Sequence, residues 1–345
     1  MAHCTILYPG LLGPDVPLEE LPQREWPDSA SLPNLALLLS RAQIKVDTKQ
    51  SFEQQLLSAL GYVITPDGEV PIAYIRQGTG YVGDRPMWCL DPAYVQIDRE
   101  LAYLAAMDEL ALTETEARQL IADINHHFAD VLEIHYHQPQ QWLVHTDLQL
   151  STCTPSEALR QDLSRMLPTG PDAQRWRSIV NEIQMLLHSH PVNEARQLVG
   201  KLPVNSLWLW GGGEIETTEP HLDMVYANHA LVAAAAARNT IRHAALPDQI
   251  EPALFEKQNV LLVLTEQMQA IRQKDVYAWF AALKQLEQAV LSPLIALLKN
   301  GKLDQLIVQS DTLHFGLNKR SLKKWWRPRK NIASRILELR KRYGD

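Results

Sequence analysis

Short apolar segments alternate with segments of helical periodicity over both ends of the chain. The apolar segments hold few polar residues, which is typical of strands buried on both faces of a sheet. The predicted strands lie in 4–12, 259–265 and 303–310, and the predicted helices in 31–43 (with Ser31 as N-cap), 51–62, 224–244 and 275–301. Strands that alternate with helices predict an α/β fold, a mostly parallel sheet sandwiched by helices.

The pattern changes in the middle of the chain. "MWCLDPAYVQID" predicts a strand, and "VLEIHYHQPQQWLVHTDLQL" predicts two strands around a short turn. "TETEARQLIADINHHF" predicts an amphipathic helix that begins with a capping box at Thr113 and Glu116, and a later long helix ends at Pro191. We therefore expect an α/β core formed by 1–86 and 205–345, and an inserted α+β domain formed by 87–204.

The stretch "SLWLWGGG" (206–213) combines a strand pattern with three successive glycines. We expect the strand to leave the inserted domain and re-enter the core sheet. Gly211, Gly212 and Gly213 would then form a turn at its carboxyl end, where open α/β sheets bind ligands. The run is not a dinucleotide fingerprint, because Glu216 stands where the last glycine of G-x-G-x-x-G belongs, and it lacks the Lys-Ser/Thr of a P-loop.

Composition places the chain among globular proteins, with 46% hydrophobic and 21% charged residues in 345. Its three cysteines form no C-x-x-C pair, which favours a reducing, cytoplasmic location. No run approaches the roughly 20 consecutive apolar residues that cross a bilayer, so no transmembrane segment is expected. The N-terminus lacks the basic and apolar regions of a signal peptide.

The charge is unevenly distributed. The net charge is −7, but 319–345 carries eleven Lys and Arg against two acidic residues. Within it, "KRSLKKWWRPRK" (Lys319–Lys330) interleaves Trp325 and Trp326 with basic residues, a combination that could stack on bases and neutralise phosphates, or lie on an anionic membrane surface. The alternative is a solvated basic helix whose tryptophans pack on the body of the protein.

Five histidines lie close together in the predicted inserted domain: His126, His127, His135, His137 and His145. If "QPQQ" is the turn between two strands, His145 falls opposite Ile134. It would then lie on the other face of the sheet from His135 and His137. Three converging ligands are therefore not expected, and we predict no metal here.

Two further groups of polar residues lie at predicted element ends. In "HSHPVNEAR", His190, Asn193 and Arg196 surround a helix break, where an Arg fork suits phosphate or carboxylate. A capping and hinge network explains them equally well. In "SDTLHFG", Asp311 and His314 follow a strand end, which suits either a ligand site or loop capping.

Several stretches resemble the archaeal-type, cofactor-independent phosphoglycerate mutases. "LLHSHPVNEARQLVGKLPVNSLWLWGGG" carries the most specific similarity. "ILYPGLLG…LPNLALLLSRA" resembles their opening strand and helix, "LLSALGY" the segment near their nucleophile, and "NVLLVLT" and "QLIVQSD" two metal-binding strands. "WLWGGG", "EARQLIADINHHF" and "WWRPR" are similar to a bacterial branch labelled regulatory proteins of the RpfE type.

This resemblance implies an alkaline-phosphatase-like core that holds two divalent metals and forms a phosphoserine. The sequence departs from that chemistry at the aligned positions. Pro9 replaces the first-strand Asp, Phe52 the nucleophilic Ser (with Ser51 adjacent), Gln269 and Gln273 an Asp and a His. Asp311 of the final Asp-His pair is kept, but Thr312 replaces the His. Pro and Phe neither ligate metal nor attack phosphate, and Gln is a poor replacement for a charged ligand.

We therefore expect a phosphoglycerate-mutase-like regulatory or binding protein that has lost the two-metal centre and the Ser nucleophile and needs no cofactor. It would bind a phosphorylated metabolite or another anion. The predicted ligand-binding residues are His190, Asn193, Arg196, Asn205, Gly211, Gly212, Gly213, Asp311 and His314. The alternatives are an active metal-dependent mutase or phosphatase with rearranged ligands, and a protein that binds nucleic acid or an anionic surface through Lys319–Lys330.

Overall fold

The computed structural model describes residues 2–65, 68–78, 86–98, 101–129, 131–159, 161–256, 258–323 and 330–343. The chain divides into two compact units. We call Met1–Gly61 with Thr218–Asp345 the core unit, and Tyr62–Thr217 the inserted unit. The inserted unit is thus longer at both ends than the predicted 87–204.

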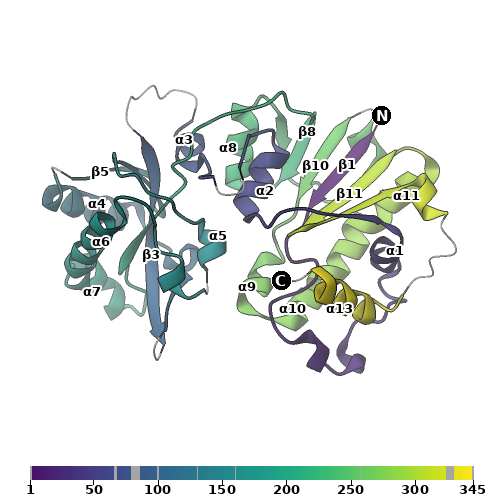
Figure 1. Cartoon of the computed structure of the whole chain (residues 1–345), viewed down its shortest axis with the longest axis horizontal. Coiled ribbons are helices and arrows are strands. Elements are labelled where there is room, and N and C mark those ends of the chain that lie inside the picture. Colours follow the sequence, from purple (N-terminus) through teal and green to yellow (C-terminus); the bar gives the residue numbers. More distant parts are fainter. Residues whose placement is uncertain are drawn as a thin grey trace. The chain divides into compact units, whose positions relative to one another are not determined.

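The core unit contains a seven-stranded sheet (Figure 1). In spatial order its strands are β2 (Gln43–Val46), β12 (Leu313–Asn318), β11 (Gln305–Ser310), β1 (His3–Leu7), β10 (Asn259–Val263), β8 (Met224–Ala227) and β9 (Arg242–Ala244). The five strands from β11 to β9 are parallel, and β12 is antiparallel to both its neighbours. The N-terminal strand therefore lies inside the sheet, between two strands from the last third of the chain.

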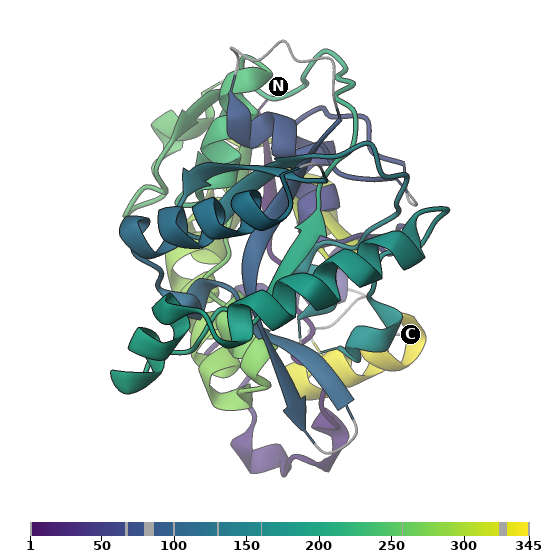
Figure 2. The same ribbon diagram turned by 90° about the vertical axis from the view of Figure 1, so that its left-hand side faces the viewer.

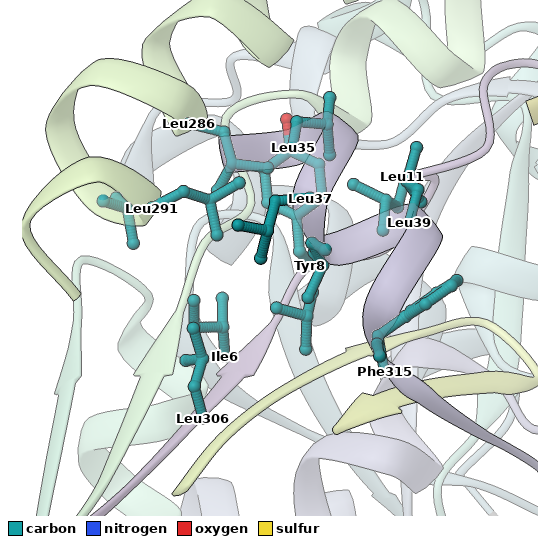
Figure 3. Packing of buried hydrophobic residues seen from close by; sticks show 14 of the residues in the cluster. Ile6, Tyr8, Leu11, Leu35, Leu37, Leu39, Leu286, Leu291, Leu306 and Phe315 are labelled. Carbon is teal, nitrogen blue, oxygen red and sulfur yellow. The ribbon is translucent and has the colours of Figure 1, made fainter. Parts of the chain in front are cut away.

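Helices cover both faces of this sheet. They are α1 (Pro33–Arg41), α2 (Phe52–Ala59), α8 (Ala230–Arg238), α9 (Met268–Gln273), α10 (Val276–Gln285), α11 (Ser292–Asn300), α12 (Lys319–Leu322) and α13 (Ile332–Tyr343). Alternation along β1 directs Ile6 and Tyr8 to the face covered by α1, where they meet Leu35 of α1 and Leu286 of the helix after β10 (Figure 3). Leu261 and Val263 of β10 are buried on the other face. The prediction of a mostly parallel sheet sandwiched by helices is confirmed.

Four strands of the core sheet were not predicted, and one of them is β2 at Gln43–Val46, which pairs antiparallel with β12 at the edge of the sheet. Segment 224–244, predicted as a single helix, contains β8, α8 and β9, so that prediction is wrong. Its alanine-rich centre favours a helix, and strands of three and four residues are too short to show alternation on either side of it. The fourth, β12, returns antiparallel after a two-residue turn in which Asp311 has a φ of 49°.

A buried carboxylate joins α1 to the helix that precedes β11. α10 and α11 are continuous through a π-helical turn at Leu286–Leu291, which contains Glu287. Glu287 is 4% exposed and accepts hydrogen bonds from the backbone N–H groups of Asn34 and Leu35 and from the side-chain amide of Asn34. It thus caps the first turn of α1, whose own N-cap residue, Leu32, provides no side-chain hydrogen bond.

The continuous helix Val276–Asn300 is, among the described residues, the one that is long and apolar enough to cross a membrane, and 50% of its most apolar window is buried within the protein. Its residues belong to the apolar cluster of the core unit, together with α1 and the sheet. Buried core helices have the same length and composition as membrane spans of this kind. The expectation that no segment crosses a membrane stays a prediction.

The inserted unit has its own five-stranded sheet. Its strands are β4 (Leu101–Ala106), β3 (Met87–Asp98), β6 (Gln141–His145) and β5 (Glu133–Gln138) in spatial order, with β7 (Ser206–Trp210) also paired to β3. Its helices are α3 (Ile72–Gln77), α4 (Glu114–His127), α5 (Pro155–Ala158), α6 (Ala173–His188) and α7 (Pro191–Leu198). α4 and α6 run across one face of the sheet and share an apolar cluster with it (Figure 2).

The strand β7 was expected to re-enter the core sheet, and this is wrong. It pairs antiparallel with β3, with Cys89 opposite Trp210 and Ala93 opposite Ser206. All five residues of β7 are buried. Leu207 and Leu209 belong to the apolar cluster formed with α4 and α6, while Trp208 and Trp210 are buried on the opposite face. A strand that is apolar on both faces has the same sequence pattern in either kind of sheet, so the pattern could not identify its partners.

Candidate functional site

The residues of "HPVNEAR" form a capping network inside the inserted unit. His190 is the N-cap of α7, and its Nδ1 accepts the backbone N–H of Val192 at 3.2 Å. Its Nε2 is therefore the protonated nitrogen, and it donates to Asp123 at 2.9 Å. Asn193, 2% exposed, donates to the carbonyls of Leu187 and Val204 and accepts the N–H of Val204.

Arg196 completes this network. It is 1% exposed, and its guanidinium donates to the carbonyls of Leu202 and Leu110 and to the carboxylate of Glu116. These bonds tie α7 to the start of α4 and to the segment that leads into β7. Because the guanidinium is enclosed by protein acceptors, the structure favours the capping role for Arg196 over an anion site.

Asn205 also has a structural partner. Its side-chain amide exchanges two hydrogen bonds with the backbone of Val95, at 2.7 and 2.8 Å, and its own N–H donates to Ala93. It therefore extends the pairing of β7 with β3. His190, Asn193, Arg196 and Asn205 all lie in the inserted unit, whereas Asp311 and His314 lie in the core unit.

The three glycines after β7 allow close packing within the inserted unit. Gly211 has a φ of 72°, in the left-handed region, and its carbonyl accepts the N–H of Ala73. A Cβ on Gly212 would overlap the indole ring of Trp88, and a Cβ on Gly213 would overlap the carbonyl oxygen of Glu69. The run therefore lets this segment lie directly against residues 69–73.

Gly213→Ala is expected to lower the free energy of unfolding by about 1–3 kcal/mol, because the added methyl group meets backbone that cannot rotate away. Thermal unfolding followed by circular dichroism measures the change. Gly316→Ala in β12 is the matched control, since the nearest atom to a Cβ there lies at an ordinary 3.7 Å. Equal effects of the two substitutions would contradict this account of the glycine run.

The histidine register differs from the expected one. His145 pairs with Glu133, not Ile134. The turn lies at the expected place, with Gln138 opposite Gln141, but a bulge between Tyr136 and Gln138 shifts the pairing by one residue. His135 and His145 consequently share a face, with ring centroids 5.2 Å apart, and His135 Nε2 lies 3.6 Å from Glu133 Oε1. Their placement on opposite faces was wrong. Among the described residues, no three His, Cys, Asp or Glu side chains are arranged to hold a metal.

The carboxyl ends of the parallel strands in the core unit mark the place where this class of sheet binds ligands. Asp311 follows β11 there. Its carboxylate accepts the N–H of Gly10, after β1, and the hydroxyl of Ser310, whose oxygen in turn accepts the N–H of Leu11. Although the residue keeps exposed surface, desolvation of its carboxyl group raises the pKa of Asp311, opposed by these hydrogen bonds and by the charge of Lys49.

His314 lies at the start of β12, beside this edge. Its Nε2 is 3.7 Å from Asp47 Oδ2. Burial lowers the pKa of His314, and the charge of Asp47 opposes that change. His314 pairs with Gln309 across the β11–β12 turn, so it borders the edge, and its side chain lies beside Asp47 and not in the Asp311 cluster.

Gln267 occupies the position between the ends of β1 and β10. It is 2% exposed, and its amide nitrogen donates to the carbonyls of Pro9 and Leu264. The two-metal centre implied by the resemblance needs several free carboxylates and imidazoles at such strand ends. Here the strand ends carry Pro9, the amide of Gln267 and an Asp311 that already accepts protein hydrogen bonds. These residues do not fit a two-metal centre, and we derive no catalytic step through one.

Two buried polar atoms in segments that follow strand ends lack a hydrogen-bond partner among the described residues: the Tyr8 hydroxyl and Gln55 Oε1. Burial, and then the charge of Glu266, raises the pKa of Tyr8, so the group stays a neutral phenol. Gln55 belongs to α2, whose first residue, Phe52, contacts His229 just beyond β8. Neither group was predicted from the sequence, where nothing distinguishes them from other buried polar residues.

The basic C-terminal segment is partly anchored. Arg340 donates to the carbonyls of Pro14 and Val16, and Arg335 to that of Leu39, so these arginines hold α13 on the core unit. Lys324–Arg329, including Trp325 and Trp326, lie outside the described residues. Binding of nucleic acid or an anionic surface through Lys319–Lys330 therefore stays a prediction.

Comparisons with known proteins identify one family. A probable 2,3-bisphosphoglycerate-independent phosphoglycerate mutase of Geobacter sulfurreducens is 35% identical over 65 residues, 19% of this chain and 16% of that protein. The enzyme of Methanothrix thermoacetophila is 39% identical over 64 residues, 18% of this chain and 16% of its own length. The match thus spans under a fifth of each of these relatives. No family model matches the chain.

Among solved structures, the cofactor-independent phosphoglycerate mutase of Thermoplasma acidophilum superimposes over 97% of this chain and 94% of its own, with a TM-score of 0.47 and 15% identity. The PH0037 protein of Pyrococcus horikoshii gives the same score and identity over 91% of this chain and 84% of its own. What the sequence comparison establishes is that a segment of this chain is similar to the 2,3-bisphosphoglycerate-independent phosphoglycerate mutases.

Proposed function

We propose that this protein is a phosphoglycerate-mutase-like regulatory or binding protein, of the RpfE-type branch, that has lost the two-metal centre and the Ser nucleophile. The observation that carries the proposal is the arrangement at the carboxyl edge of the core sheet. Gln267 donates to the carbonyls of Pro9 and Leu264. Asp311 accepts the N–H of Gly10 and the hydroxyl of Ser310. This set of side chains differs from a two-metal centre, because a proline and a neutral amide stand where such a centre needs carboxylates or imidazoles.

The nucleophile position supports the same proposal. Phe52 begins α2, and the adjacent Ser51 is 5% exposed and used as the N-cap. Its hydroxyl accepts the N–H of Gln54, while the Gln54 side chain accepts the N–H of Ser51 in a complete capping box. A nucleophilic serine needs a general base or a metal to activate its hydroxyl. Ser51 instead has the environment of a structural cap.

We place the ligand, a phosphorylated metabolite, at the carboxyl edge of the core sheet and not beside Arg196. The Tyr8 hydroxyl and Gln55 Oε1 have no hydrogen-bond partner in the part of the chain that the structure describes, and they support this location because such buried polar atoms often bind water or a ligand. Lys49, whose charge acts on Asp311, supplies a cation near the same edge.

Metal analysis and turnover test the loss of catalysis. We expect purified full-length protein to hold less than stoichiometric divalent metal by mass spectrometry, and to interconvert 2- and 3-phosphoglycerate no faster than a blank with or without Mn²⁺. Stoichiometric metal together with chelator-sensitive turnover would establish the active-enzyme alternative instead.

Ligand binding is tested separately by thermal shift with 3-phosphoglycerate. A ligand at a hundred times its dissociation constant stabilises the folded state by about 2.7 kcal/mol. We expect a shift that is reduced in Lys49→Ala and that inorganic sulfate at the same concentration does not reproduce. An unchanged melting temperature would remove the phosphometabolite from the proposal, whatever the outcome of the turnover assay.

A further inference from the structure

The inserted unit contains a concavity that is independent of the network around Arg196. Its volume is about 550 Å³, within the range of small-molecule sites. It lies where the end of α4, the start of β5, the end of β6 and the first turn of α6 meet. The lining residues are Asn125, Ala129, Val131, Leu132, Glu133, His145, Thr146, Asp147, Leu148 and Arg175.

The floor of the concavity is fixed by internal bonds. Both side-chain atoms of Asn125 bond the backbone of Ile134 at 2.8 Å, and the Thr146 hydroxyl accepts the N–H of Leu148. Leu132 and Leu148 are 3% and 8% exposed and belong to the apolar cluster of the inserted unit, so their positions are fixed by the surrounding protein. Because the residues of the floor are already ordered, ligand binding would cost little further conformational entropy.

The rim carries opposite charges that do not satisfy each other. Arg175 and Asp147 line the same concavity, are both exposed, and make no ion pair or side-chain hydrogen bond with any residue that the structure describes. Glu133 adds a second carboxylate, whose Oε1 lies 3.6 Å from His135 Nε2. Groups of opposite charge that face one cavity without pairing complement a ligand that carries both charges.

We propose that this concavity binds a small zwitterion, a free amino acid or a dipeptide. Its carboxylate would pair with the Arg175 guanidinium, and its ammonium group with Asp147 and Glu133. Its apolar side chain would lie on Leu132 and Leu148. A phosphate or other pure anion is disfavoured, because it would meet two carboxylates at the rim, and a simple cation would leave Arg175 without a partner.

Ligand-observed NMR on the full-length protein tests this with L-alanyl-L-leucine. We expect it to bind, and N-acetyl-alanyl-leucine and alanyl-leucinamide, each missing one charge, to bind at least about tenfold more weakly. L-leucine is the shorter zwitterion, and its affinity relative to the dipeptide identifies which of the two the cavity fits. Equal affinity for the blocked and unblocked peptides, or no binding of any zwitterion at tens of millimolar, would overturn the proposal.

Matched variants place the binding in this concavity. Arg175→Ala and Asp147→Asn are each expected to weaken the dipeptide about tenfold, a typical loss for one charge-assisted contact. Arg177→Ala, an exposed arginine two residues along α6 that does not line the concavity, should bind as the wild type does. Because all three positions are exposed, the variants should keep the wild-type melting temperature. An unaltered affinity in Arg175→Ala would contradict the proposed contact.

Discussion

Replacement of Asp91 by alanine is expected to lower the free energy of unfolding of the inserted unit by about 3–5 kcal/mol. The Asp91 side chain is 3% exposed and pairs with Arg76 through two hydrogen bonds of 2.6 and 2.8 Å. It also accepts the backbone N–H of Trp142 and the indole N–H of Trp210. Its removal would leave a nearly buried guanidinium and two buried N–H groups without their acceptor. Urea denaturation followed by tryptophan fluorescence measures the loss.

Two variants serve as comparisons for Asp91→Ala. Asp147→Ala removes an exposed, unpaired carboxylate and should change the free energy of unfolding by no more than about 0.5 kcal/mol. The double variant Arg76→Met/Asp91→Leu removes both charges, and it should recover part of the loss because apolar replacements can substitute for a buried ion pair. If Asp91→Ala were as stable as Asp147→Ala, the central role of Asp91 would be disproved.

Arg196→Ala is the second large expected loss, again about 3–5 kcal/mol. The substitution would leave the carbonyls of Leu110 and Leu202 and the carboxylate of Glu116 without their donors. Arg196→Lys should not restore stability, because an ammonium group cannot reproduce the fork that reaches three acceptors. Arg177→Ala, on the exposed side of α6, is the control that should leave the urea midpoint unchanged.

Acid sensitivity gives Arg196 an independent readout. Burial tends to raise the pKa of Glu116, but hydrogen bonds from Thr113 and Arg196 outweigh it and hold the pKa below its ordinary value of 4.5. A carboxyl group whose pKa is lower in the folded protein stabilises it fully above the ordinary value, and this contribution is lost as the pH falls through the lowered value. The stability of Arg196→Ala should therefore fall less steeply than that of the wild type below pH 4.5. Parallel melting-temperature profiles would contradict the coupling.

The sequence was sufficient where one local pattern determines an element. The apolar run of β10, the capping box at Thr113 and Glu116, and the helix break at Pro191 are all present at the predicted places. The capping role of Asn193 could be foreseen for the same reason, because its acceptors Leu187 and Val204 are close by in the sequence. The role of Arg196 could not, because its acceptors Glu116 and Leu110 lie 80 and 86 residues away.

The sequence was insufficient where the deciding partner is remote or the spacing is irregular. Ser31 was expected to cap α1, yet its hydroxyl bonds Asp28, and the cap comes from Glu287. One bulge in β5 moved His145 opposite Glu133. The polar bonds of Gln267 at the carboxyl edge depend on the pairing of β1 with β10, which are separated by some 250 residues, so no short-range pattern could reveal them.

The position of β1 between β10 and β11 sets an order of events during synthesis. The inserted unit is one continuous stretch, Tyr62–Thr217, so a ribosome completes it before any neighbour of β1 has been made. β1 and α1 must wait for residues 259–310, which supply both flanking strands and the Glu287 cap. While residues 8–258 are made, the nascent chain thus carries β1 as an apolar strand without either of its neighbours. Cells that make this protein would need to shield β1 from aggregation until β10 and β11 emerge.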